Sequence, residues 1–210
     1  MLGRIIRSEA CIAEGAAYLA EIEPRFAAAL DLTGTLPLRL RKDGFEALLD
    51  AIVSQQLSVA AANSIWNRLD AANLIAPDDV LAASEDDLRG CGLSRPKIKY
   101  VKSLAESGLD YAALRTTPNR DVIAQLIEIK GIGNWTAEIY AMFSLGRADV
   151  FAAGDLALQE AARILFELDA RPSEKAFNRM AEAWAPWRAV AARLLWAYYR
   201  KMKDREGIRG

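Results

Sequence analysis

The feature that most constrains the fold of this sequence is a Gly-Ile-Gly turn between two helical segments. Thr117-Pro118 predicts a helix start, with Thr117 as the cap and proline in the first turn. Residues 131–133 interrupt that helix, because glycine accepts positive φ and leaves no side chain beside the backbone. A second helix is expected from about Trp135 to Gly146. The sequence therefore predicts a compact helical hairpin whose exposed amide N–H groups suit a phosphate.

The turn alone fits an ordinary helix pair with a glycine C-cap equally well. The segment after the second helix favours a functional site, because residues 150–154 lead into a single acid, Asp155, and then into another helix. An aspartate before a helix is a common N-cap. From the local sequence, a plain cap and a reactive carboxylate both remain open for Asp155.

The rest of the chain is also patterned for helices. Apolar residues recur at helical spacing and strand-like alternation is hard to find, so we expect an all-α protein. Its 210 residues suffice for one or two domains. Residues 43–46 predict a capping box, and Ser84 with Asp87 three residues later predicts the start of a short helix. Ser58 and Ser173 predict further caps, and a break is expected at Pro24.

Residues that are missing exclude several chemistries. The chain has no histidine, which removes His-based acid–base catalysis and His-containing zinc sites. Cys11 and Cys91 cannot supply the four ligands of an iron–sulfur cluster, so we expect two reduced thiols in a cytoplasmic protein. No apolar run is long enough to span a membrane. Glu9, Glu14 and Glu21 interrupt the first apolar residues, so no signal peptide is expected.

The net charge of −1 does not indicate nucleic-acid binding, which would need a local basic face and backbone donors. One basic group lies at a predicted helix start, where it is either solvated or compensated by an external anion. It comprises Arg95, Lys97, Lys99 and Lys102. Gln55 and Gln56 lie at a helix–helix corner. Such amides are either solvated or able to reach bases, since they donate and accept.

Two tryptophans need explanation. Trp196 lies nearly opposite Trp187 on the last helix, at ~100° per residue, so it requires a second apolar surface. That surface is either another packing interface or a binding pocket. Trp135 lies on the expected inward face of its helix, with core packing as the alternative to a pocket role.

Five blocks of sequence occur in a specific order. They are residues 52–58, residues 92–94 with Lys97 and Tyr100, residues 129–137, residues 150–158 and residues 184–188. This ordered set resembles the helix-hairpin-helix (HhH-GPD) DNA glycosylase superfamily, and more closely its 3-methyladenine DNA glycosylase II (AlkA) branch. Together the blocks span roughly residues 43–200, and the ordered set is far more specific than Gly-Ile-Gly alone.

The resemblance implies a two-lobed helical fold with a cleft between the lobes. Residues 1–42 would pack with the C-terminal lobe. Residues 43–146 would form a six-helix lobe that ends in the hairpin, at about 118–146. Residues 147–210 would form the C-terminal lobe with the catalytic aspartate. The separate N-terminal sheet domain of the bacterial prototype is not expected here.

The resemblance also implies roles for individual residues. Asp155 matches the catalytic aspartate, and Trp135, Trp196 and Ile139 would line the base pocket, with Ile139 replacing a tyrosine of the prototype. Trp135 stands where strand-cutting members carry a lysine, so no Schiff base is expected. Gln56 falls at or beside the residue that fills the gap left by an extruded base. The expected DNA contacts are Gln55, Gln56, Lys130, Gly131, Ile132, Gly133, Asn134 and Thr136.

The function implied is a monomeric, monofunctional DNA glycosylase of base excision repair, active in the cytoplasm on the nucleoid. It would hydrolyse the N-glycosidic bond of alkylated purines such as 3-methyladenine and 7-methylguanine flipped out of duplex DNA. The alternatives are a non-catalytic helix-hairpin-helix DNA-binding protein and a glycosylase for uracil or an oxidised purine. No cofactor is required, although the hairpin can hold Na⁺ or K⁺ through the backbone carbonyls of Ile127, Ile129 and Ile132.

One carboxylate fits this chemistry. Cleavage of the N-glycosidic bond builds positive charge on the sugar, and a carboxylate there stabilises that charge and orients or deprotonates water. Glycoside hydrolases use a second carboxyl group to protonate the leaving group. A ring-methylated purine is already cationic and leaves readily, so Asp155 alone suffices in a chain without histidine.

Overall fold

The computed structural model describes residues 3–205, and these residues form an all-helical protein, as the sequence predicts. Within them the only β-type pairing is an isolated antiparallel bridge between Ile5 and Arg147. The chain divides into two compact units. Unit 1 comprises Met1–Leu40 and Ala141–Gly210, and unit 2 comprises Arg41–Tyr140.

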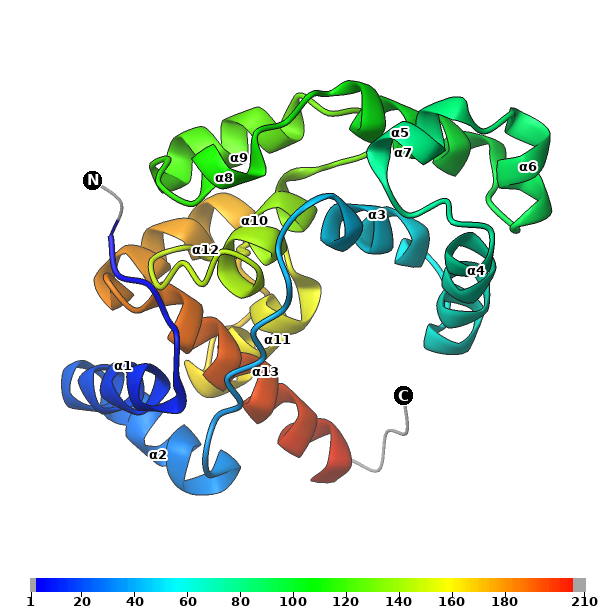
Figure 1. The fold of residues 1–210 in the computed structure, drawn as a ribbon. Helices are drawn as coiled ribbons and strands as arrows, with labels where there is room; N and C mark the ends of the chain where they lie inside the picture. Colours follow the sequence, from blue (N-terminus) through cyan, green and yellow to red (C-terminus); the bar gives the residue numbers. More distant parts are fainter. Residues whose placement is uncertain (1–2, 206–210) are drawn as a thin grey trace. The chain divides into compact units, whose positions relative to one another are not determined.

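Unit 1 is built around its last helix. Its elements are α1 (Glu9–Ile22), α2 (Pro24–Thr33), α11 (Leu156–Leu165), α12 (Glu174–Ala181), the 3₁₀ helix η1 (Glu182–Trp184) and α13 (Arg188–Arg205). Helix α13 packs against α1, α2 and α11 (Figure 1). The predicted break occurs at Pro24, because proline begins α2 and the Glu23 side chain accepts the Arg25 amide N–H. Within residues 3–205, no helix has the length and apolar character needed to cross a bilayer.

An aromatic cluster centred on Trp184 fills the core of unit 1. The centroid of its ring system lies 5.1 Å from that of Phe26, 5.4 Å from Phe151 and 5.8 Å from Phe166. Phe177 completes the cluster at 6.0 Å. Edge-to-face aromatic packing adds to the hydrophobic stabilisation. The cluster also anchors the segment that enters α11, since Phe151 lies in that segment.

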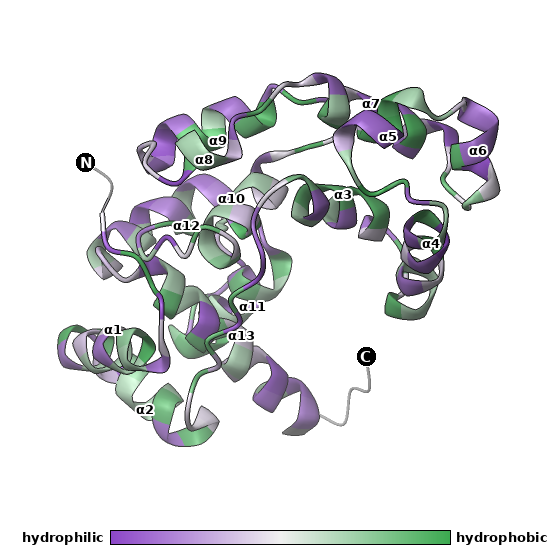
Figure 2. Ribbon diagram, viewed as in Figure 1, coloured by the Kyte–Doolittle hydropathy of each residue, from purple (hydrophilic) through white to green (hydrophobic). Residues whose placement is uncertain are grey.

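Unit 2 consists of short helices. They are α3 (Phe45–Ser54), α4 (Val59–Ala71), α5 (Pro77–Ala82), α6 (Glu85–Gly90), α7 (Arg95–Glu106), α8 (Tyr111–Leu114) and α9 (Asn119–Ile127). Helix α7 packs against α3, α5 and α6, and α3 also packs against α4. Apolar and polar stripes run along these helices (Figure 2), as expected where one face is buried. The buried face of α3 is the predicted one: Phe45, Leu48, Leu49, Ile52 and Val53.

Helix α10 (Asn134–Phe143) contains the division between the units, which falls after Tyr140. The lobe boundary expected from the sequence is Gly146. The last residues of α10 belong to unit 1 because they pack within it, as shown by the Met142 carbonyl, which accepts a hydrogen bond from Arg193.

Two predicted helix starts are wrong. Gly44, at φ 104°, is the N-cap of α3, so the capping box expected at residues 43–46 does not form. The Asp43 carboxylate instead binds the Arg115 guanidinium at 2.7 Å, which holds the pKa of Asp43 below its usual value. Helix α9 begins at Asn119 rather than after Thr117, because the Thr117 hydroxyl donates back to the Ala113 carbonyl.

The other predicted caps are confirmed. Ser84 and Asp87 form a reciprocal capping box at the start of α6. The Ser58 hydroxyl accepts the Ala61 amide N–H at the start of α4, and Ser173 does the same for α12.

Candidate active site and DNA-binding hairpin

Asp155 is the N-cap of α11 and also contacts the off-stripe tryptophan of α13. Its Oδ1 accepts the amide N–H groups of Ala157 at 2.9 Å and Leu158 at 3.0 Å. The same oxygen accepts the Nε1–H of Trp196 at 3.2 Å. Asp155 is half-buried. The carboxylate is therefore a cap and is still partly accessible, so both roles left open by the sequence are compatible with its position.

Two side-chain hydrogen bonds hold the segment that precedes Asp155. The Arg188 guanidinium donates to the Asp149 carboxylate at 2.6 Å. The buried Gln159 side chain donates to the Ala153 carbonyl at 2.8 Å. These bonds attach the approach segment to the starts of α13 and α11, so the position of the Asp155 carboxylate is fixed before any ligand arrives.

The second apolar surface that Trp196 requires is the ring of Phe143, which also belongs to unit 1. Its ring lies 5.9 Å from the ring of Phe143, tilted by 34°, and its Nε1–H reaches Asp155. Trp196 is half-buried and Phe143 is buried. The sequence predicts only that Phe143 lies on the inward face of its helix. Its contact with Trp196 could not be predicted from that spacing.

Unit 1 has a depression that includes the first residues of α11. It has a volume of about 540 Å³, lies between α11 and α13, and begins one residue after Asp155. The lining residues are Leu156, Ala157, Glu160, Ile164, Arg171, Tyr199, Met202 and Lys203. Leu156 is 64% exposed. Asp155 and Trp196 are not among the lining residues, so this depression is not assigned to the carboxylate.

The Gly-Ile-Gly turn of unit 2 joins α9 to α10. Gly131 has φ +96°, and a Cβ built there would lie 2.3 Å from Cγ of Tyr100. Only glycine satisfies both conditions, since L side chains rarely adopt this backbone conformation. The Gln55 side chain donates to the Gly131 carbonyl at 2.9 Å. The turn is therefore positioned by α7 and by the corner after α3.

The residues predicted to contact DNA fall into two groups. Lys130, Gly133 and Asn134 are exposed at the turn. Thr136 and Ile132 are 7% and 4% exposed, so their side chains are not available to a strand. Contacts of Ile132 and Thr136 with DNA could then involve only their backbone groups, and they stay a prediction.

The two corner glutamines also differ. The amide nitrogen of Gln55 is used on the hairpin, which makes Gln55 a support for the turn. Gln56 is exposed and has φ +57°, an uncommon conformation for a residue with a side chain. Its predicted role at the gap left by an extruded base stays a prediction.

Trp135 is not a core residue. It is 48% exposed, so the packing alternative is wrong. Ile139 is half-buried. Both lie in unit 2, whereas Asp155 and Trp196 lie in unit 1. The pocket roles of Trp135 and Ile139 stay predictions.

The basic group at the start of α7 is partly explained within unit 2. Lys97 donates to the Val53 carbonyl at 2.6 Å, and Lys102 donates to the Ala83 carbonyl at 2.6 Å. Partial burial lowers the pKa of Lys97. Each of these two ammonium groups therefore has a carbonyl partner near the end of another helix, and the two alternatives for the basic group stay open.

The monovalent cation expected at the hairpin stays a prediction. The Ile129 carbonyl accepts the Ile132 amide N–H at 3.0 Å, and a carbonyl oxygen has a second lone pair for an ion. Neutral backbone oxygens suit Na⁺ or K⁺. Within residues 3–205, no cluster of three or more His, Cys, Asp or Glu side chains is arranged to hold a metal ion.

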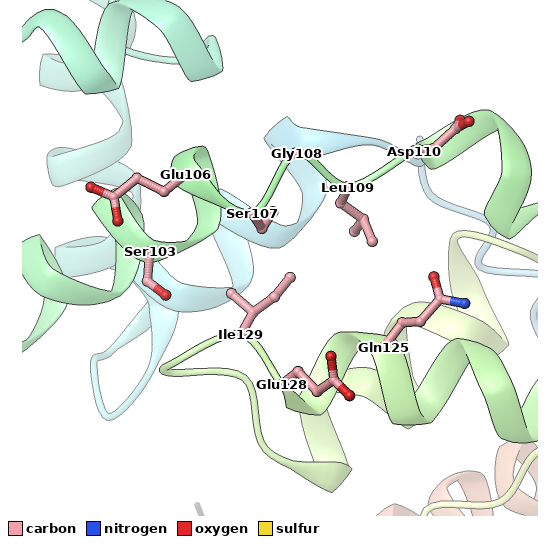
Figure 3. A pocket seen from close by; sticks show the side chains of 9 residues that line it. All are labelled: Ser103, Glu106, Ser107, Gly108, Leu109, Asp110, Gln125, Glu128 and Ile129. Atoms are coloured by element: carbon pink, nitrogen blue, oxygen red, sulfur yellow. The ribbon is translucent and has the colours of Figure 1, made fainter.

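A second depression in unit 2, of about 490 Å³, is unsuited to DNA. Figure 3 shows it between the end of α7, the following turn and the end of α9. Its lining is Ser103, Glu106, Ser107, Gly108, Leu109, Asp110, Gln125, Glu128 and Ile129. Carboxylates repel phosphates, so this surface is not a candidate for the nucleic-acid contact.

Comparison with known proteins agrees with this geometry. The family model described as "HhH-GPD superfamily base excision DNA repair protein" matches residues 49–186. The chain is 36% identical over 165 residues to DNA-3-methyladenine glycosylase 1 of Schizosaccharomyces pombe, covering 74% of this chain and 72% of that protein.

Two solved structures share the fold. DNA-3-methyladenine glycosidase from Bacillus halodurans superimposes with a TM-score of 0.81 at 34% identity, covering 89% of each chain. The S. pombe 3-methyladenine DNA glycosylase in complex with abasic DNA gives 0.73 at 32% identity, covering 87% of this chain and 95% of that one. This chain therefore belongs to the HhH-GPD superfamily of base excision DNA repair proteins, in its 3-methyladenine DNA glycosylase branch.

Proposed function

We propose that this protein is a monofunctional DNA glycosylase that hydrolyses the N-glycosidic bond of alkylated purines in duplex DNA. It would act as a monomer in the cytoplasm. The observation that carries the proposal is the Asp155 carboxylate, held at one oxygen by two backbone amides and by the indole of Trp196. The names of its relatives support the same substrate class.

Extrusion of the base is the first step of the proposed reaction. A base must leave the duplex to be reached, which costs a few kcal/mol of unstacking. An indole face attracts a cationic base by roughly 0.5–2 kcal/mol, so Trp196 offsets part of this cost. As the bond from C1′ to the base nitrogen breaks, its electron pair leaves with the base and positive charge develops on the sugar. Asp155 stabilises that charge.

Water completes the hydrolysis. Its oxygen forms the new bond to C1′, and its proton passes to Asp155 or to solvent. A methylated purine cation departs as a neutral base, so no second acid is needed. Trp135 occupies the position of the lysine found in strand-cutting members of the family, so no amine is available there for a Schiff base. The product is then an intact abasic strand.

The hairpin would bind the strand through its backbone. The first amides of α10 have no partner within their own helix, and a phosphate there needs no side-chain charge. This explains how a protein of net charge −1 can bind DNA. We also propose that the carbonyls of Ile127, Ile129 and Ile132 hold Na⁺ or K⁺, which would add positive charge near that phosphate.

The ion proposal is tested by DNA affinity at constant ionic strength. Fluorescence anisotropy with an abasic oligonucleotide is expected to give tighter binding in KCl or NaCl than in tetramethylammonium chloride, because the organic cation is too large for the hairpin. Equal affinity in all three salts would rule out the ion.

The function is tested with duplex DNA that carries a mixture of methylated, deaminated and oxidised bases. Mass spectrometry of the released bases is expected to find 3-methyladenine and 7-methylguanine, with the sugar–phosphate strand uncut. Release of uracil or oxidised purines alone would show that the substrates are those bases and not alkylated purines. Tight binding with no released base would favour the non-catalytic DNA-binding protein.

A further inference from the structure

A buried arginine lies against Phe143, the ring that packs beside Trp196. Arg193, on α13, is only 2% exposed. Its Nη1 donates to the Ala189 carbonyl at 2.9 Å, and its Nη2 donates to the carbonyls of Leu38 at 3.2 Å and Met142 at 3.5 Å. Its guanidinium carbon lies 4.5 Å from the centroid of the Phe143 ring.

The charge of Arg193 is not neutralised by these partners. Its hydrogen-bond acceptors are backbone carbonyls, and no ion pair of Arg193 occurs among the side chains of residues 3–204. Burial, and then repulsion from Arg39, lowers the pKa of Arg193 to about 10, so it remains protonated at neutral pH. A buried arginine is usually paired, because an unpaired buried charge is costly. Unit 1 thus retains a full positive charge in its interior.

Two side chains in successive contact connect the Arg193 guanidinium to the candidate catalytic carboxylate. Phe143 lies against the guanidinium, Trp196 lies 5.9 Å from Phe143, and the Trp196 indole donates to Asp155. All four residues belong to unit 1. The buried Phe143 ring lies between the guanidinium and the half-buried Trp196 indole. Electrostatic interactions are therefore screened less here than at the surface.

We propose that Arg193 is a specificity-determining residue whose charge disfavours a cationic base on the Trp196–Phe143 surface relative to a neutral base of the same shape. The inference rests on the proposed function, because it assumes that a flipped purine reaches this surface. At roughly 10 Å and an effective dielectric constant of about 20 to 40, the repulsion amounts to about four- to 20-fold in affinity. The charge would thereby narrow the preference of the electron-rich indole surface for cationic over neutral alkylated purines.

The test uses two DNA duplexes that differ in one charge. One carries 7-methylguanine on a 2′-fluorinated sugar, where the fluorine slows cleavage of the glycosidic bond. The other carries 7-methyl-7-deazaguanine on the same sugar, where carbon replaces N7 and removes the positive charge. The readout is the ratio of the two dissociation constants, which does not depend on turnover.

Three variants separate charge from packing. Arg193→Met removes the charge and the hydrogen bonds, Arg193→Gln removes the charge and keeps donor N–H groups, and Arg193→Lys keeps the charge. Met and Gln are expected to shift the binding ratio toward the cationic base by about four- to 20-fold, while Lys leaves the ratio as in the original protein. Thermal unfolding identifies any variant that does not fold. If Arg193→Met does not fold, the comparison of Arg193→Gln with Arg193→Lys still tests the effect of the charge.

Two outcomes would overturn the inference in distinguishable ways. If all three variants weaken both duplexes equally, Arg193 only supports the fold and the specificity role is wrong. If the original protein binds neither modified base more tightly than guanine, the proposed function fails first and the inference falls with it.

Discussion

Asp155→Asn is expected to abolish nearly all base release while DNA binding persists. Asparagine is as good an N-cap as aspartate, and its side-chain oxygen can still accept from Ala157, Leu158 and Trp196. The variant therefore keeps the local structure and loses only the charge that stabilises the developing sugar cation. Loss of one preorganised group of this kind lowers the rate by roughly 10³-fold. The measurement is single-turnover release of 7-methylguanine from methylated DNA.

Asp110→Asn is the matched control. Asp110 is also an N-cap aspartate, since its Oδ1 accepts the Ala113 amide N–H at 2.9 Å at the start of α8. The same chemical change at the same structural position is expected to leave base release unaltered. Asp155→Asn should bind abasic DNA at least as tightly as the original protein, because a negative charge near phosphates is lost. Substantial turnover by this variant would disprove the catalytic role.

Gly131→Ala is expected to damage the hairpin and DNA binding together. The new Cβ would lie 2.3 Å from Cγ and 2.5 Å from Cβ of Tyr100, so rotating the tyrosine ring cannot relieve the clash. The backbone must move, and φ +96° is strained for alanine in any case. We expect a loss of about 1–3 kcal/mol in the free energy of unfolding, measured with urea, and weaker binding to abasic DNA, measured by anisotropy.

Gly133→Ala tests whether this effect comes from the geometry of Gly131. A Cβ at Gly133 would have no neighbour within 4 Å, and its φ lies outside the positive range. This variant is expected to unfold within about 0.5 kcal/mol of the original protein, as an ordinary surface substitution does. Equal destabilisation by the two alanines would show that the contact with Tyr100 does not constrain the turn.

The helical fold and several helix starts were predictable from the sequence. Ser58, Ser84 and Ser173 bond to amides three residues away, so short-range hydrogen bonding decides them. The buried face of α3 was equally predictable, because helical spacing alone places its apolar residues on one side. Asp43 was mispredicted because its partner, Arg115, lies 72 residues away and competes with the local cap.

The candidate site was predictable only in part. Asp155 and Trp196 were identified in the sequence by the family resemblance and by an aromatic residue off the helical stripe. The exposure of Trp135, the use of Gln55 on the Gly131 carbonyl and the placement of Phe143 against Trp196 were decided by packing. Each depends on contacts between helices, which periodicity along one helix cannot specify.

The amino-acid sequence by itself determined that this protein is helical, that a glycine turn joins two of its helices, and that one aspartate begins the helix after them. Those features depend on backbone preferences and on bonds within a few residues. Only the tertiary structure placed an indole on that aspartate and a buried arginine behind its aromatic neighbour. Arg193 reaches the Leu38 carbonyl across 155 residues of sequence, and no local pattern records which distant carbonyl a long side chain will meet.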